Sequence, residues 1–152
     1  RDSNISVEGE IGFVGYDNGK LSEGTNIEDA VSFANKSNID AMAISVGNTH
    51  LQTSKKASID FNKINLIEAK TKIPLVLHGS SGIPVEQRKK LARKTKVAKL
   101  NIGTEIRMTF GEALRKNLKN NPKTYDRLQL LKPTIKDLTK VTKKIIKQIG
   151  PN

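Results

Sequence analysis

The sequence of 152 residues contains no cysteine, so it has neither a disulfide framework nor a thiolate metal site. It has no tryptophan and only two tyrosines, which gives little support for a stacking platform on single-stranded nucleic acid. No apolar run reaches the length of about eighteen residues that a membrane helix needs, and no signal-peptide pattern opens the chain. We therefore expect a soluble, cytoplasmic chain without a membrane partner. It begins with Arg1 rather than methionine, so the chain is either processed or a piece of something longer.

Charge is unevenly distributed along the chain, whose formal net charge is +12. Residues 1–84 carry 8 Lys and Arg against 10 Asp and Glu, whereas residues 85–152 carry 19 against 5. A basic half of this kind could attract nucleic acid or phosphorylated metabolites. The alternative is a biased codon usage that inflates lysine on solvated helix faces, and it is favoured because the lysines are spread along helices. Nucleic acid is therefore not an expected partner.

Apolar runs of strand length alternate with helical patterns. The middle two runs are nearly continuously apolar, as expected for parallel strands that are covered on both faces. The order predicts four βα units followed by a basic amphipathic helix, which indicates an α/β fold with a parallel sheet. The predicted strands lie in 5–15, 41–47, 73–79 and 97–103, and the predicted helices in 26–37, 59–72, 84–95, 104–120 and 133–150.

Two folds accommodate this order, namely half of a (β/α)8 barrel or a small open doubly wound sheet. In a barrel the carboxyl ends of all strands form one rim where catalytic groups gather, whereas an open sheet concentrates them at one switch point. Here every predicted strand ends on polar residues or glycine, which favours the barrel rim. These residues are Glu8 and Glu10, Gly47 and His50, His78 and Gly79, and Asn101 and Thr104.

The two histidines, His50 and His78, follow what would be adjacent strands, so their imidazoles could converge on a divalent metal ion. A single histidine would more often be structural, but a pair at equivalent positions makes the two interpretations about equal. Catalytic zinc takes about three protein ligands, and no third histidine exists, so Glu10 or an absent segment must complete the site. Glu8 and Glu10 alternate and should face one side of a strand, where an ordinary ion pair is the alternative.

Two turns are candidate anion sites. Gly79, Ser80 and Ser81 lie between a strand and a helix that opens with Pro84, so backbone N–H groups there could hold a phosphate. The same holds for residues 101–104 at the end of the next strand. Ordinary βα turns also use glycine and serine, so each turn alone is weak support. Two such turns beside a histidine pair are a stronger indication.

The motifs "VEGEIG", "GNTH", "IPLVLHGSSGIP" and "KLNIGTEIRMTFGEALR" resemble those of the class II, metal-dependent fructose- and tagatose-bisphosphate aldolases, in the family's order and over essentially all 152 residues. The resemblance implies that residues 1–152 form the last four βα units of a (β/α)8 TIM barrel plus a C-terminal helix. It implies Zn²⁺, with a monovalent cation as a second cofactor, and a phosphorylated sugar as substrate. The implied metal ligands are His50 and His78, with Glu10 as an alternate ligand, and the implied substrate-binding residues are Gly79, Ser80, Ser81, Asn101, Ile102, Gly103 and Thr104.

The activity that the resemblance implies is reversible aldol cleavage of fructose 1,6-bisphosphate to dihydroxyacetone phosphate and glyceraldehyde 3-phosphate, a step of glycolysis, by a homo-oligomeric enzyme. The alternatives are tagatose-bisphosphate cleavage, or a catalytically inactive half-barrel that serves as a binding or structural module. The chain departs from the family at Leu51, where glycine is usual, and it lacks the first four units with their histidine ligand and acid/base aspartate. Asp17, in the segment 14–24 where the family has a mobile loop, is a candidate acid.

Overall fold

Four short parallel strands form the centre of the protein in the computed structural model, which describes residues 4–16, 19 and 22–150. The strands are β1 (Glu8–Glu10), β3 (Ala41–Ala43), β5 (Leu75–Leu77) and β6 (Val97–Leu100), and they pair in the order β1-β3-β5-β6. The helices α1 (Ile27–Lys36), α2 (Phe61–Lys70), α3 (Val85–Lys94) and α4 (Thr104–Asn120) follow them in turn. The predicted βα order is thereby confirmed, and spatial order follows sequence order, as it does in a barrel.

The sheet is curved in the sense that a barrel requires. The edge strands β1 and β6 would lie roughly 14 Å apart in a flat four-stranded sheet. Yet the ammonium of Lys99 on β6 lies 2.7 Å from a carboxylate oxygen of Glu8 on β1. The register pairs Glu10 with Ala43 and Val76 with Lys99, so these side chains share one face of the sheet. The structure is therefore a partial barrel whose inner face carries charged residues.

The hydrophobic core lies on the outer face of the sheet, between the strands and their helices. Met42 and Leu77 point into it from the strands and meet Ile64 and Leu91 of the helices, and all four side chains are fully buried. Gly9 is part of this packing, because a Cβ there would lie 2.9 Å from the ring of Phe33 on α1. The core therefore fixes the strands against α1, α2 and α3 and leaves the inner face for other contacts.

Several elements differ from the sequence-based expectation. The strands are three or four residues long, shorter than the apolar runs, and after β3 the chain continues as a buried loop at residues 44–46. Residues 15–16 of the first run form β2 (Gly15–Tyr16), which pairs in parallel with β4 (Thr49–His50) in a second, two-stranded sheet. A 3₁₀ turn, η1 (Ser80–Gly82), and a short helix, α5 (Arg127–Leu131), were not predicted.

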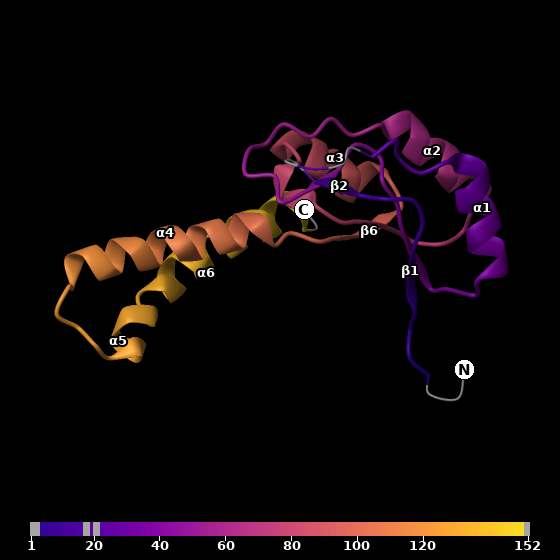
Figure 1. Cartoon of the computed structure of the whole chain (residues 1–152). Helices are drawn as coiled ribbons and strands as arrows, with labels where there is room; N and C mark the ends of the chain where they lie inside the picture. Colours follow the sequence, from indigo (N-terminus) through magenta and orange to yellow (C-terminus); the bar gives the residue numbers. More distant parts are fainter. Residues whose placement is uncertain (1–3, 17–18, 20–21, 151–152) are drawn as a thin grey trace.

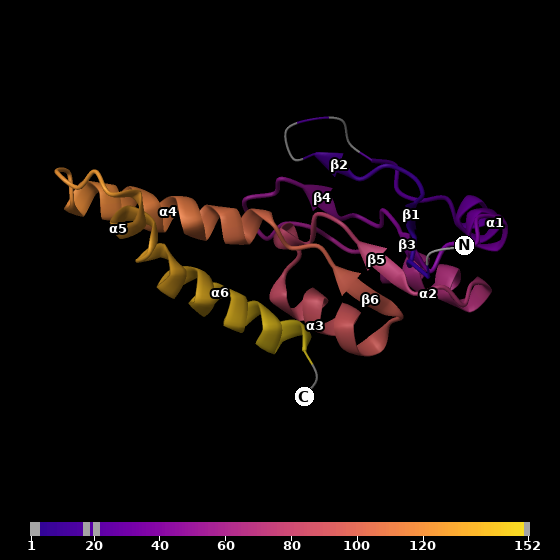
Figure 2. The same cartoon turned by 90° about the horizontal axis from the view of Figure 1, so that it is seen from below.

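The last part of the chain forms an arm. α4, α5 and α6 (Thr134–Ile149) project from the α/β body in Figure 1, and Figure 2 shows α6 running back beside α4 to reach α3. The apolar side chains of α4 are only partly covered, because no residue of that helix is fully buried and Phe110 and Leu118 are 37% and 44% exposed. None of the helices described is long and apolar enough to cross a bilayer.

Replacing Gly9 by alanine should lower the free energy of unfolding by about 1–3 kcal/mol, because the added methyl group overpacks against the Phe33 ring. The matched control is Gly111→Ala in α4, where the new methyl group meets only the flexible end of Arg115. It should raise stability by up to about 1 kcal/mol through helix propensity. Urea unfolding of both variants tests the packing, and equal effects of the two substitutions would contradict it.

Candidate active site

The two histidines lie side by side at the carboxyl edge of the sheet. His50 ends β4 and His78 directly follows β5, and their ring centroids are 6.3 Å apart. Tyr16, which pairs with His50 across β2 and β4, places its ring centroid 5.2 Å from that of His50. The expected convergence of the two imidazoles is therefore present in the structure.

Backbone contacts bring the two histidine segments together. Gly79 has φ of +63°, and a Cβ there would lie 2.5 Å from the carbonyl oxygen of Thr49, so this position requires glycine. Asn48, only 2% exposed, donates from Nδ2 to the His78 carbonyl at 2.9 Å and accepts at Oδ1 from the Val46 N–H at 2.7 Å. The role of Asn48 could not be predicted from the sequence, because an asparagine after a strand is equally typical of a solvated turn.

Two carboxylates approach His78 from β1, in agreement with the expectation that they face one side. Glu8 Oε1 lies 3.0 Å from Nε2, and Glu10 Oε2 lies 3.5 Å from Nδ1. The hydrogen bond from Lys99 holds the pKa of the Glu8 carboxyl below its usual range, against the upward effect of burial, and the hydrogen bond to His78 adds to the lowering. Glu8 is therefore held as a carboxylate between Lys99 and His78.

The electrostatic surroundings of His50 favour its neutral form. Burial lowers the pKa of this imidazole, the nearby His78 lowers it further, and Glu10 partly opposes both. A neutral imidazole is the form that binds a metal ion.

The donor set fits two ligand positions of a divalent metal ion. On a tetrahedral ion with Zn–N distances of about 2.0–2.1 Å, two imidazole centroids lie roughly 5 Å apart. The centroids of His50 and His78 are 6.3 Å apart, so the two rings would have to move closer to share one ion, and one nitrogen of His78 would have to leave its carboxylate. Within the described ranges no group of three His, Asp or Glu side chains is arranged so that it could hold a metal ion. A further ligand would come from Glu10, after release from His78, or from outside these ranges. Asp17 lies outside the described residues.

The two candidate anion turns are in direct contact. The Ser80 N–H donates to the Asn101 carbonyl at 3.0 Å, and the Asn101 N–H donates to the Leu77 carbonyl at 2.9 Å. The hydroxyl of the fully buried Ser80 donates to the Leu77 carbonyl at 2.9 Å. Ser81 Oγ accepts from the Glu105 N–H at 3.1 Å. The Ser80 hydroxyl thus donates within the protein, whereas Ser81 Oγ accepts in its contact, so its O–H can still donate to an anion beside the backbone amides.

The second turn ends at the start of α4. Ile102 and Gly103 are half-buried and lead into Thr104, and Gly103 as N-cap supplies no side chain to the amides of the first turn. The guanidinium of Arg107 lies over Gly103, where a Cβ would be 2.7 Å from Nη1. Helix amides with an adjacent guanidinium favour an anion. Sequence analysis did not single out Arg107.

Leu51 follows His50 with φ of +56° and is 57% exposed. This left-handed conformation suits glycine better than leucine, which agrees with the glycine that the family resemblance led us to expect there.

A cluster of charged residues behind the turns was also missed. Arg88 of α3 is fully buried and donates to Glu105 Oε2 at 2.6 Å, and Lys55 donates to the same oxygen at 3.0 Å. Burial on its own would raise the pKa of the Glu105 carboxyl, but the hydrogen bonds from Arg88 and then Lys55 outweigh it and hold the pKa below its usual range. The cluster therefore keeps Glu105 ionised.

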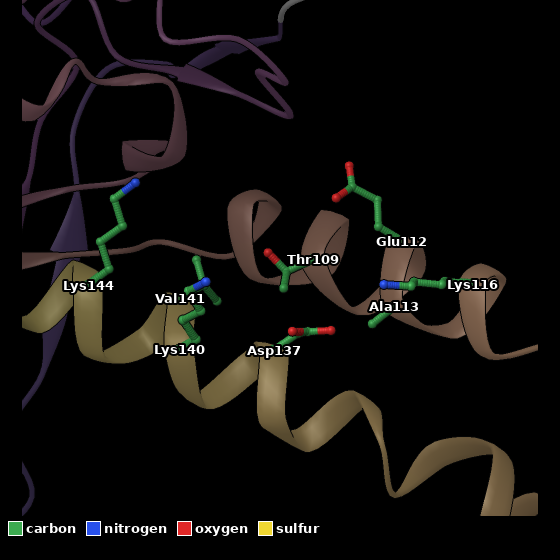
Figure 3. Close-up of a pocket in the computed structure, with 8 residues that line it drawn as sticks. All are labelled: Thr109, Glu112, Ala113, Lys116, Asp137, Lys140, Val141 and Lys144. Carbon is green, nitrogen blue, oxygen red and sulfur yellow. The ribbon is translucent and has the colours of Figure 1, made fainter.

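The pocket in Figure 3 does not coincide with this site. It has a volume of about 360 Å³ and lies in the arm, between α4 and α6. Its walls combine lysines and carboxylates over a small apolar floor, and neither histidine contributes. The chemistry of the strand ends, not this pocket, defines the candidate active site.

Comparison with known proteins gives a family and a fold. The family model described as fructose-bisphosphate aldolase class-II matches residues 1–152. The chain is 35% identical over 150 residues to the 6-phospho-5-dehydro-2-deoxy-D-gluconate aldolase of Shouchella clausii, with 97% of this chain and 51% of that protein covered. It is 33% identical over 152 residues to the enzyme of that name from Bacillus licheniformis, again covering 97% of this chain and 51% of the relative. The chain thus spans about half the length of the curated relatives it matches.

Solved structures of aldolases superpose on this chain. The YdjI aldolase from Escherichia coli K12 superposes with a TM-score of 0.72 at 27% identity, covering 96% of this chain and 49% of that one. A putative fructose-1,6-biphosphate aldolase from Coccidioides immitis superposes with a TM-score of 0.74 at 21% identity, covering 95% and 52%. Because its sequence identity is low, the second match supports the fold alone.

Asn48→Ala should lower the free energy of unfolding by about 1–3 kcal/mol, because it leaves the Val46 N–H and the His78 carbonyl without their buried partner. Asn62→Ala, on the exposed side of α2, is the matched control and should change stability by less than about 0.5 kcal/mol. Urea unfolding measures both. A loss at Asn48 no larger than that at Asn62 would show that Asn48 does not hold the two segments together.

Glu105→Gln should make the free energy of unfolding depend less on pH in the acid range. The carboxyl has an ordinary pKa of 4.5, and a lower pKa in the folded protein means that its stabilisation is present above about pH 4.5 and is lost as the pH falls through the folded value. The variant should therefore be less stable at neutral pH and lose less on acidification. Glu112→Gln, an exposed residue on the same helix, is the control. Parallel pH profiles for Glu105→Gln and the parent protein would refute the role of Glu105.

Proposed function

The chain belongs to the class II fructose-bisphosphate aldolase family, and we propose that the protein to which it belongs is a metal-dependent lyase that cleaves a phosphorylated sugar by a retro-aldol reaction. The observation that carries the proposal is the pairing of His50 and His78 at adjacent strand ends, directly beside two amide-bearing turns. One group of residues suits a metal ion and the other suits a phosphate, and aldol cleavage of a sugar phosphate needs both.

His50 and His78 would hold the metal ion, which we propose to be Zn²⁺, with Glu10 as an alternate ligand. When bound, such an ion supplies Lewis-acid polarisation of the substrate's ketone carbonyl. The chain's own contribution is to keep His50 neutral, through burial, and to orient His78 through Glu8. A monovalent cation beside the phosphate is proposed as a second cofactor.

The substrate phosphate would be held by the turn of Gly79, Ser80 and Ser81 and by the residues that lead into α4. The N–H groups of Ser80 and Asn101 already donate to backbone carbonyls, so the other amides of the two turns would supply the donors. The proposal for these last residues includes Asn101, Ile102, Gly103 and Thr104. The N-terminus of α4 favours the phosphate charge, and Arg107 beside Gly103 reinforces it. Asp17 is proposed as an acid for the reaction, together with an aspartate from the half of the barrel that the relatives have in addition.

Fructose 1,6-bisphosphate is the first candidate substrate, because the matching family model carries its name. In that case the enzyme serves glycolysis in the cytoplasm. The second candidate is 6-phospho-5-dehydro-2-deoxy-D-gluconate, because relatives at 35% and 33% identity are named for it. The two differ at the end of the molecule away from one phosphate, where the second carries a carboxylate. We propose a homo-oligomer in either case, and a non-catalytic half-barrel module as the remaining alternative.

The deciding experiment assays the full protein that contains this chain with both substrates, with and without a chelator. We expect cleavage of at least one substrate, loss of activity on chelation, and recovery when Zn²⁺ is added back. In His78→Ala, kcat/KM should fall by more than about 100-fold and should not recover with Zn²⁺, since even groups outside the ligand shell cost 10–100-fold.

The relative kcat/KM of the two substrates assigns the specificity. Cleavage of neither substrate by folded, zinc-loaded protein would contradict the proposed function and favour the non-catalytic module. Chelator-resistant cleavage would contradict the metal-dependent mechanism.

A further inference from the structure

Two cations share the same two oxygen acceptors behind the candidate phosphate site. Arg88 Nη2 donates to the Ser81 carbonyl at 2.7 Å and to Glu105 Oε2 at 2.6 Å. Lys55 Nζ donates to the same carbonyl at 3.5 Å and to the same carboxylate oxygen at 3.0 Å. We call Lys55, Arg88, Glu105 and the Ser81 carbonyl the two-cation clamp. The clamp joins four segments, namely the loop after β4, η1, α3 and the start of α4.

Arg88 is held in one orientation. Its side chain is fully buried, Nε donates to the Ser80 carbonyl at 3.2 Å, and Nη1 donates to Gln148 of α6 at 3.3 Å. Burying a guanidinium is costly unless its N–H groups are all paired, and here four acceptors surround it. The fixed fork of the guanidinium therefore sets where the carbonyls of Ser80 and Ser81 point.

Those two carbonyls determine the direction of the neighbouring amides. In a planar trans peptide the C=O and the following N–H point in opposite directions. Because the Ser80 and Ser81 carbonyls point inward to Arg88, the N–H groups of Ser81 and Gly82 point away from the buried clamp. Both residues are buried, and N–H groups that point to the same side of a turn can hold an anion there.

The clamp also fixes the second turn against the first. Glu105 is the second residue of α4, and its own N–H donates to Ser81 Oγ at 3.1 Å. The N-terminus of α4 is thus locked to η1 through both the backbone and the side chain of one residue. Two cations against one carboxylate leave one net positive charge behind the site, which favours a phosphate in front of it.

We propose that Lys55 and Arg88 are positioning residues that preset the backbone amides of the two turns for a phosphate group, an inference that rests on the proposed function. Neither side chain acts on the reacting atoms. Their role is to maintain the geometry in which the amides of η1 and of the first turn of α4 bind one phosphate together. Loss of the clamp should therefore weaken the binding of phosphate more than it slows the chemical step.

The test uses the full protein with the substitutions Lys55→Met, Lys55→Arg and Arg88→Lys. Lys55 is the cleaner position, because its side chain is 39% exposed and its replacement should be tolerated by the fold. Lys56→Met, at the next, exposed lysine, is the matched control for charge. Calorimetry measures the affinity of each variant for inorganic phosphate, and steady-state kinetics measures KM and kcat for the cleaved substrate.

For Lys55→Met we expect the phosphate Kd and the KM to rise by about 3–10-fold while kcat stays within about twofold, the signature of lost binding. Lys55→Arg should recover most of the affinity, because it restores a cation at the same two acceptors. Arg88→Lys should weaken phosphate binding by at least about 10-fold, because one ammonium cannot reproduce the fork. Lys56→Met should match the parent protein.

Phosphate affinity unchanged in folded Lys55→Met and Arg88→Lys would overturn the proposal, and so would an equal loss in Lys56→Met, which would indicate a general charge effect. A loss in kcat alone would also count against it. Phosphate binding by the parent protein that depends on the clamp residues, without cleavage of any phosphorylated sugar, would refute the proposed function. The positioning role of the clamp would then stand. If it binds no phosphate even at about 10 mM, both fail.

Discussion

The parallel pairing of β1, β3, β5 and β6 is the constraint on which the rest of the structure depends. Parallel strands present all their carboxyl ends at one edge, so residues that are tens of positions apart in sequence meet there without any contact of their own. Glu10, His78 and Asn101 reach this edge directly, and His50 reaches it through β4. Small groups then set the spacing, because Gly79 lets two backbone segments touch and Asn48 joins them.

The inner face and the turns are stabilised by ion pairs instead of apolar packing. Lys99, Glu8 and His78 form one chain of contacts across the curved sheet, and Lys55, Arg88 and Glu105 form another behind the turns. Of these groups only Arg88 is fully buried. Ion pairs of this kind stabilise a fold little compared with apolar side chains, but they specify geometry, since each partner has few alternatives. This is consistent with a surface that is shaped for ligands, whereas the outer face holds the hydrophobic core.

Features that follow from local periodicity could be predicted from the sequence. The common face of Glu8 and Glu10 follows from strand alternation, and the proximity of the two histidines follows from parallel order. The burial of Arg88 could not be predicted, because "EQRKKLARK" reads as a solvated basic helix face. Its partners are carbonyls of η1, Gln148 and Glu105, which only the tertiary fold brings together. The pairing of β2 with β4 was missed because strands of two residues carry no periodic signal. The substrate could not be chosen because the chain holds part of the site.

The central claim is that His50 and His78 bind one metal ion at the edge of the sheet. X-ray absorption at the zinc edge of the full protein tests it most directly, because it counts the nitrogen ligands and measures their distances. We expect at least two imidazole nitrogens at about 2.0–2.1 Å, and fewer imidazole ligands in His78→Ala. A coordination shell made only of oxygen atoms, or one that is identical in His78→Ala, would contradict it.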